Sequence, residues 1–282
     1  MTRLRDKMKQ EMVLRGFSAG TQDQYYRAVM KLHDYYKRSP AQLTEEEIKS
    51  FLLFVIQKEQ CAASTYNVMI HGLKFFYKVV LKKVVLALEL PTRKEPQKLP
   101  DILSQQEVAR IIKATFNLKH RTILIVAYGA GLRASEAASL RVGDIDSERR
   151  CIHIREAKGR KDRYVPLSPV MLNTLRHYWK QCRLGLKKEH DFIFPGTSGG
   201  ALCPAAIGMI YKHSKHLAGI KKDGGVHALR HAFATHALEA GADIYAIKQI
   251  LGHSSMTSTV RYLRMTDKAL QLVESPIERL GL

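Results

Sequence analysis

The sequence predicts a mostly α-helical chain of two domains, with a small antiparallel β-sheet in the second domain. Three observations support this fold class. Apolar residues recur at helical spacing along most of the chain, two short β-prone stretches flank a cationic turn, and a proline-rich segment separates two blocks. A length of 282 residues also favours two domains, since one domain takes about 150.

The proline-rich segment, residues 91–100, marks the predicted domain boundary. It holds three prolines, three cations and one anion within ten residues. Proline interrupts helices and favours extended backbone. We therefore expect a helical domain over residues 1–90, a basic linker over 91–100 and a second domain over 101–282.

The first block shows four helical patterns. The first lies near residues 2–15, and capping-box spacing at Thr21 with Gln24 and at Thr44 with Glu47 predicts the next two starts. Apolar and aromatic residues then recur at helical spacing within each pattern, and again over residues 66–80. We expect these stripes to form the core of a small four-helix domain.

The second block mixes helices with a hairpin. A capping box at Ser104 with Glu107 precedes a helix, and an apolar segment follows over residues 121–129. Residues 151–155 and 163–167 are β-prone, and the cationic stretch between them predicts a hairpin turn. Further helical patterns cover residues 169–183, 205–218, 227–240 and 243–251.

Charge predicts a polyanionic partner. The chain has 46 Lys and Arg against 26 Asp and Glu, a net charge of +20. Residues 1–100 hold 18 of these cations against 10 anions, so the excess is spread over both blocks. A basic field of this kind favours nucleic acid, gripped by both domains.

Composition also narrows the compartment. The four cysteines are Cys61, Cys151, Cys182 and Cys203. They lie far apart in the sequence and form no C-x-x-C pair, which argues against a disulfide framework and against a zinc finger. The sequence contains no run of 18 apolar residues, so it predicts no membrane-spanning helix, and its first residues do not form the apolar stretch of a secretory signal. These features favour the reducing cytoplasm.

Four short segments carry candidate chemistry. They are Gly131-Leu-Arg133-Ala-Ser-Glu136, Lys158 on the hairpin turn, His227-Ala-Leu-Arg230-His231, and Leu251-Gly-His253 followed by Tyr262. Two arginines can hold the oxygens of one phosphate, and a lysine can protonate a leaving alkoxide. Histidine can accept a proton near neutral pH, and an activated tyrosine can form a covalent phospho-enzyme.

This chemistry needs no metal ion. His227 and His231 have a spacing that can bind zinc, but a zinc protease would place Glu directly after the first His, where this chain has Ala228. We therefore predict no metal and no other cofactor.

The order Arg, Lys, His-x-x-Arg, His, Tyr resembles the tyrosine recombinase (phage integrase) family, with similarity along the whole chain. The compact layout is similar to Xer-type enzymes and to small transposon- or phage-borne integrases. The resemblance implies a SAM-like helical core-binding domain and a tyrosine recombinase catalytic domain, which form a C-shaped clamp around DNA. It also implies a homo-tetramer that acts on specific recombination sites in double-stranded DNA.

The resemblance further implies a role for each matching residue. Tyr262 would attack the phosphate and form a 3′-phosphotyrosine, while Arg133 and Arg230 hold its oxygens. Lys158 would protonate the leaving 5′-oxygen, and His227 would act as base toward Tyr262. The remaining roles go to His253, which would hydrogen-bond the phosphate, and to Glu136, which would orient Arg133. His231 falls outside this set and is expected to be structural.

Other cations are expected to contact the DNA backbone: Lys82, Lys83, Arg93, Lys94, Lys98, Arg160, Lys161 and Arg163. By the same resemblance, a C-terminal tail of about residues 267–282 would dock on a neighbouring protomer. The alternative is that this segment forms a final helix that packs on its own domain.

The predicted function is therefore site-specific recombination or integration, without ATP or metal. Two alternatives stay open. One is a non-catalytic DNA-binding or architectural protein on the same fold, and the other is relaxation of supercoils in the manner of a type IB topoisomerase.

Overall fold

The computed structural model describes residues 2–83, 90–94, 101–157, 161–182 and 191–263. The chain divides into two units, Met1–Lys98 and Leu99–Leu282, and the division falls inside the proline-rich segment 91–100. The expected C-terminal tail, residues 267–282, lies outside the described residues.

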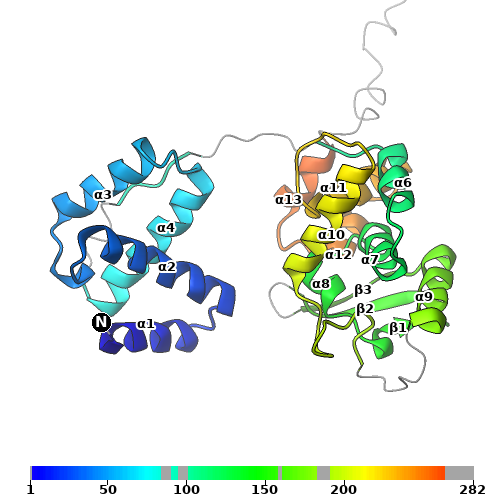
Figure 1. Ribbon diagram of the computed structural model, residues 1–282, viewed down its shortest axis with the longest axis horizontal. Coiled ribbons are helices and arrows are strands. Elements are labelled where there is room, and N and C mark those ends of the chain that lie inside the picture. Colours follow the sequence, from blue (N-terminus) through cyan, green and yellow to red (C-terminus); the bar gives the residue numbers. More distant parts are fainter. Residues whose placement is uncertain (1, 84–89, 95–100, 158–160, 183–190, 264–282) are drawn as a thin grey trace, which may run out of the picture. The chain divides into compact units, whose positions relative to one another are not determined.

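The first unit is helical (Figure 1). Its elements are α1 (Thr2–Leu14), α2 (Ala19–Tyr36), the 3-10 turn η1 (Pro40–Gln42), α3 (Glu45–Gln57), α4 (Ala63–Phe75) and the π-helical η2 (Phe76–Val80). Its core contains the predicted apolar stripes, with Leu32, Ile48 and Ile70 fully buried. The prediction of a helical first domain is confirmed.

The helix starts show what a capping pattern can predict. Thr44 and Glu47 form the expected reciprocal capping box at the start of α3, and Ser104 and Glu107 form one in the second unit. The box predicted at Thr21 is wrong, because α2 begins earlier and the Ser18 side chain accepts from the Thr21 N–H.

The second unit combines helices with a three-stranded sheet. Its helical elements are α6 (Gln105–Lys113), α7 (Leu118–Gly129), α8 (Ala134–Ala138), η3 (Val142–Asp144), α9 (Pro169–Cys182), α10 (Pro204–Leu217), α11 (His227–Glu239), α12 (Ile244–Leu251) and α13 (Met256–Leu263). The strands are β1 (Ile145–Asp146), β2 (Cys151–Ala157) and β3 (Lys161–Pro166), in the order β1-β2-β3.

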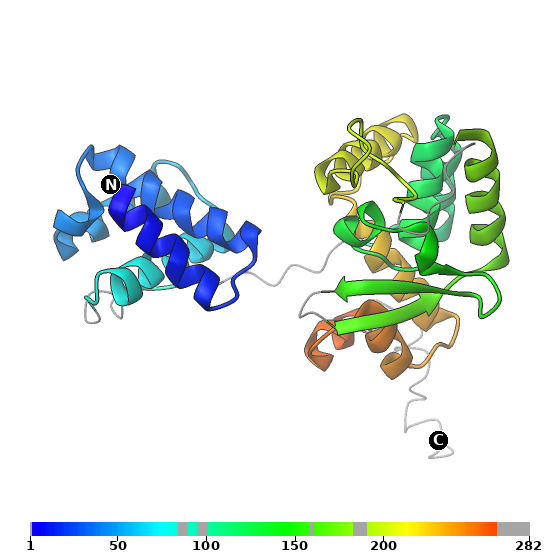
Figure 2. The ribbon, with the colours of Figure 1, turned by 90° about the horizontal axis from the view of Figure 1, so that it is seen from below.

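The predicted hairpin is the centre of that sheet. β2 and β3 pair antiparallel, with Ile152 opposite Val165 and His153 opposite Tyr164. The short strand β1, which no sequence pattern indicated, adds to the outer edge of β2. On the other edge, β3 contacts α12, as Figure 2 shows below the sheet.

Helix α11 joins the helices at the start of the second unit to the helices at its end. It contacts α6, α7, α12 and α13. Its buried positions are mostly small, including Ala228, Ala232 and Ala234, which lets the neighbouring helices approach closely. Two of the predicted site residues, His227 and Arg230, are therefore carried by a helix that four other helices contact.

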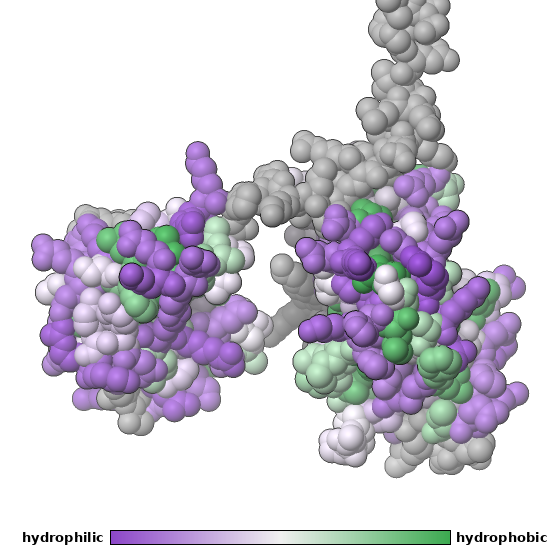
Figure 3. Space-filling view, turned by 45° about the horizontal axis from the view of Figure 1, so that its top comes forward, coloured by the Kyte–Doolittle hydropathy of each residue, from purple (hydrophilic) through white to green (hydrophobic). Residues whose placement is uncertain are grey.

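Hydrophilic residues cover most of the described surface on the face shown in Figure 3. None of the helices in the described ranges combines the length and apolar character that crossing a bilayer needs.

Gly131 makes the tight turn between α7 and α8. Its φ of +61° lies in the left-handed region, and a Cβ built there would meet Phe233 Cδ1 of α11 at 2.5 Å. Any other residue would therefore strain the backbone and also crowd the Phe233 ring of α11. The turn fixes Arg133, two residues later, against the helix that carries Arg230.

The substitution Gly131→Ala tests this packing. We expect it to lower the free energy of unfolding by roughly 2–4 kcal/mol, from left-handed strain together with overpacking. Gly219→Ala is a matched control, because Gly219 has a φ of +68° and no atom within 4 Å of its built Cβ. Urea denaturation of both variants measures the difference, and equal losses would contradict the steric part of the argument.

Candidate active site

A pocket of about 290 Å³ brings together segments that are far apart in the sequence. Its walls come from the start of α8, from α11, from the turn after α12 and from α13. The lining residues are Arg133, His227, Arg230, His231, Gly252, His253, Ser254, Ser258 and Tyr262. Five of the six residues to which the sequence assigned catalysis therefore share one pocket.

Arg133 is placed by the first turn of α8. The Glu136 carboxylate accepts the backbone N–H of Arg133 at 2.8 Å and its Nη1 at 2.7 Å. The side chain remains 22% exposed at the pocket wall. Arg133 can therefore contact a ligand in the pocket while Glu136 orients its guanidinium.

Arg230 is fully buried and held by backbone carbonyls. Its Nη1 donates to the Gly131 oxygen at 2.8 Å, and its Nη2 donates to the Leu251 oxygen. The Leu251 carbonyl belongs to the last residue of α12, where the partial charge of a helix is negative and stabilises a cation, and the Gly131 carbonyl lies in the turn just after α7.

One donor of Arg230 is left over. Among the described residues, its buried Nε has no hydrogen-bond partner. Burial, and then the charge of Arg133, lowers the pKa of Arg230 to about 10, so it stays cationic at neutral pH. A buried cation with an unsatisfied N–H at a pocket wall is suited to an anion such as a phosphate.

Glu136 joins three guanidiniums. Besides Arg133, its oxygens accept from Arg163 Nη1 at 2.9 Å and Nη2 at 2.8 Å, and Arg230 Nη1 lies 3.8 Å away. Burial alone would raise the pKa of this carboxyl, but hydrogen bonds from Arg163 and Arg133 outweigh burial and lower it to about 2. Glu136 is therefore ionised at neutral pH.

The structure corrects the place of Arg163, which we expected on the DNA backbone. Only 8% of its side chain is exposed, because two guanidinium nitrogens bind Glu136 and Nε donates to the Ile250 oxygen at 2.6 Å. The Cδ of Arg163 also lies 3.1 Å from the position of a Cβ built on Gly252. Arg163 thus ties β3 to α8 and to the end of α12.

Two pocket histidines are neutral at pH 7. Burial, followed by the charges of Arg230 and Arg133, lowers the pKa of His253 to about 4 and also lowers that of His227. His253 Nδ1 lies 2.9 Å from the hydroxyl of Thr259, which is fully buried. If that hydroxyl donates, Nε2 of His253 carries the proton and can donate to a ligand.

Tyr262 contacts His231, to which the sequence assigned no catalytic role. Its side chain is only 2% exposed and packs with Ala234, Ile247 and Leu251. Its hydroxyl lies 2.9 Å from His231 Nδ1, a contact that the sequence did not indicate. The i, i+4 spacing of His227 and His231, which can also bind zinc, indicates that both side chains share one helix face.

The remaining predicted residues are scattered or undescribed. Lys82, Lys83, Arg93 and Lys94 are exposed in the first unit. Lys83 Nζ donates to the Ala41 oxygen, and Arg93 stacks over the Tyr66 ring. Lys158, Arg160 and Lys98 lie outside the described residues, as does the side chain of Lys161.

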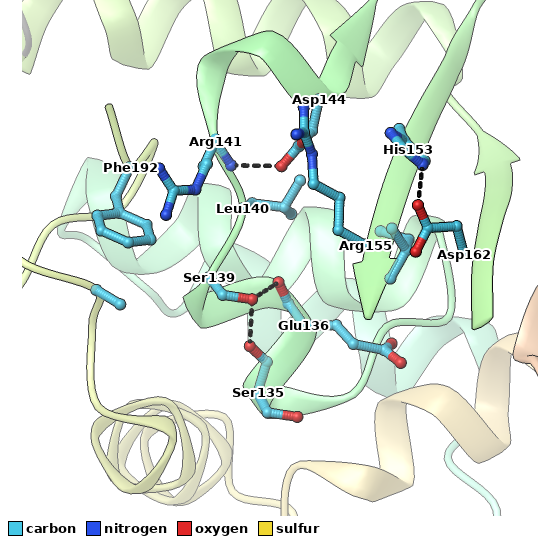
Figure 4. A pocket seen from close by; sticks show the side chains of 12 residues that line it. Ser135, Glu136, Ser139, Leu140, Arg141, Asp144, His153, Arg155, Asp162 and Phe192 are labelled. Carbon is cyan, nitrogen blue, oxygen red and sulfur yellow. Dashed lines mark hydrogen bonds and ion pairs between the residues drawn. The ribbon is translucent and has the colours of Figure 1, made fainter. Parts of the chain in front are cut away.

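A larger pocket of about 830 Å³ lies next to Glu136 (Figure 4). Its cations are already engaged there: Arg155 pairs with Asp144 at 2.6 Å, and Arg141 stacks over Phe192 at 4.6 Å. His153 contacts Asp162 at 3.0 Å. With carboxylates beside its cations, this pocket suits a phosphodiester less well than the smaller one. Within the described ranges, no group of three or more His, Cys, Asp or Glu is placed to hold a metal ion.

Comparisons with known proteins place this chain in a family. A model of the phage integrase family matches residues 101–269, and a model of the phage integrase N-terminal SAM-like domain matches residues 4–85. The chain therefore belongs to the phage integrase family, the tyrosine recombinases.

Named relatives support this membership. The chain is 38% identical over 282 residues to a protein of Sinorhizobium fredii named "Putative integrase/recombinase y4qK", covering 99% of this chain and 90% of that protein. It is 30% identical over 272 residues to tyrosine recombinase XerD of Oceanobacillus iheyensis, covering 91% of each. The fold matches that of XerH site-specific recombinase bound to palindromic difH substrate, with a TM-score of 0.72 and 21% identity over 94% of this chain and 82% of that chain.

Glu136→Gln tests the carboxylate at the centre of the arginines. The change keeps the side-chain shape but leaves buried guanidiniums uncompensated, so we expect the free energy of unfolding to fall by about 3–5 kcal/mol at pH 7. The control is Glu45→Gln, whose carboxylate pairs with Lys49 on the surface of α3 and which should change stability little. If Glu136→Gln were as mild as the control in urea denaturation, the carboxylate would not hold this cluster together.

His253 predicts a pH dependence of stability. Its pKa is about 4 when folded and about 6.5 when unfolded. As pH falls below about 6.5, the unfolded chain therefore takes up a proton that the folded chain resists, and stability drops until about pH 4. The variant His253→Asn, which can still accept from Thr259, should lose less stability over this window. His177→Asn on the exposed face of α9 is the control, and urea midpoints between pH 4 and 7 give the comparison.

Proposed function

We propose that this chain is a site-specific DNA recombinase that cleaves and rejoins duplex DNA through a 3′-phosphotyrosine at Tyr262. One observation carries the proposal: two arginines, two neutral imidazoles and a tyrosine hydroxyl from distant segments line one pocket. The names of the relatives, an integrase/recombinase and a tyrosine recombinase, support the same activity.

The arginines provide the seat for the scissile phosphate. Arg133 reaches the pocket from α8, and the unsatisfied Nε of Arg230 offers a donor from α11. Charge builds on the non-bridging oxygens as phosphorus becomes five-coordinate, and fixed guanidiniums stabilise that charge without reorganising. His253 adds a neutral N–H donor to the same oxygens.

The reaction exchanges one phosphate ester for another. The Tyr262 oxygen bonds to phosphorus, the bond from phosphorus to the 5′-oxygen breaks, and Lys158 protonates that oxygen. The phosphotyrosine keeps the energy of the phosphodiester, so rejoining runs the same steps in reverse and needs no ATP. These roles for Tyr262 and Lys158 come from the family resemblance.

We propose that both units bind DNA. The net charge of +20 and the exposed cations Lys82, Lys83, Arg93 and Lys94 supply sequence-independent attraction to the phosphate backbone. The XerH neighbour is bound to a palindromic DNA substrate, which fits action at paired recombination sites by an assembly of several copies. We propose that the assembly here is a tetramer.

Tyr262→Phe tests the proposed function. Suicide DNA, nicked next to the cleavage point so that the released fragment diffuses away, should trap wild-type protein covalently, as seen by denaturing electrophoresis. The Phe variant should form no adduct while binding the same DNA, because it lacks only the nucleophilic oxygen. A wild-type protein that never forms an adduct would support the DNA-binding alternative. Relaxed but unrecombined plasmid products would support a topoisomerase-like activity.

A further inference from the structure

The Tyr262 hydroxyl has a hydrogen-bond partner to which neither the sequence nor the family resemblance gave a role. His231 Nδ1 lies 2.9 Å from the Tyr262 oxygen, while the ring of His227 packs edge-on against the His231 ring at 4.6 Å. Both histidines project from α11, one turn apart. The imidazole nitrogen in hydrogen-bond contact with the Tyr262 hydroxyl therefore belongs to the second histidine.

We propose that His231 is the residue that accepts the proton of Tyr262 when its oxygen attacks the phosphate. The proposal rests on the proposed function and assigns a base to it. His231 is then a catalytic residue, because it touches the reacting oxygen, and the role expected for His227 changes to supporting the His231 ring.

Geometry favours this assignment. A general base must lie within hydrogen-bond reach of the proton it removes, at about 2.6–3.2 Å between heavy atoms, and only then does its basicity matter. The 2.9 Å contact meets that condition in a pocket whose walls also include Arg133, Arg230 and His253. The hydroxyl is also buried, so bulk water competes poorly for its proton.

The position on α11 fixes both groups. His231 follows Arg230 directly, and Arg230 is pinned by the Gly131 and Leu251 carbonyls. α13, which carries Tyr262, packs against the same helix. The phosphate-binding guanidinium and the imidazole next to the nucleophile are therefore held by one rigid element.

The proton balance is complete. The phenolic proton moves to Nδ1 of neutral His231 as the bond between oxygen and phosphorus forms, and the bound phosphate stabilises the resulting imidazolium. Lys158 gives its proton to the leaving 5′-oxygen. In rejoining, the 5′-hydroxyl returns a proton to Lys158, and His231 returns the other to the tyrosine oxygen.

His231→Asn separates holding the hydroxyl from accepting its proton. The Asn side-chain oxygen can lie near the Nδ1 position and accept the hydrogen bond, but the amide does not titrate. His231→Ala removes both abilities and leaves space for added imidazole. His216→Asn, on the exposed surface of α10, is the control for handling and folding. Thermal unfolding and DNA binding are measured for every variant.

The rate of adduct formation on suicide DNA is then measured in a single turnover with two substrates. One has the normal phosphate and the other a sulfur in place of the 5′-bridging oxygen, which leaves without needing a proton. We expect His231→Asn to bind DNA normally but to react about 10²- to 10⁴-fold more slowly on both substrates. Lys158→Ala should be slow on the phosphate alone, and imidazole should partly restore His231→Ala.

Two results would overturn the assignment. If His231→Asn reacts at the wild-type rate, His231 only holds the hydroxyl. If its defect disappears on the sulfur substrate, His231 acts on the leaving group instead of the nucleophile. A failure of the proposed function is distinguishable, because wild-type protein would then form no Tyr262-dependent adduct with either substrate.

Discussion

One buried carboxylate makes the positive pocket possible. Glu136 contacts Arg133 at 2.7 Å and Arg163 at 2.8 Å, and Arg230 lies 3.8 Å away. Three guanidiniums at these distances repel one another, and a single anion offsets only part of that repulsion. The pocket therefore keeps a surplus of positive charge, which is what binding a phosphodiester requires.

The same contacts connect the elements that carry the site. Arg163 links β3 to α8 through Glu136 and to α12 through the Ile250 oxygen. Arg230 links α11 to the ends of α7 and α12. A pocket built from four separate stretches of chain thus has its walls cross-tied by buried side chains, which limits how far each functional group can drift.

The sequence predicted the fold class and the main elements, because periodicity and capping are local signals. It also indicated Arg133, Arg230, His253 and Tyr262 by their order. It misplaced Arg163 and did not indicate the contact between His231 and Tyr262, for a physical reason. Whether an arginine faces solvent or a buried carboxylate 27 residues away depends on packing between elements. Similarly, the partner of the Tyr262 hydroxyl depends on how α13 lies on α11.

The lowered pKa of His253, whose ring contacts Thr259, has a further consequence for DNA binding. Burial, and then the charges of Arg230 and Arg133, keep the pKa of His253 near 4. Under the proposed function, a phosphodiester that enters the pocket would neutralise part of the arginine field and shift this pKa upward. Association with DNA would then be coupled to uptake of a proton from the medium in mildly acidic solution. By the reciprocity of linked equilibria, acidification would tighten the complex through this group even as it weakens the unliganded fold.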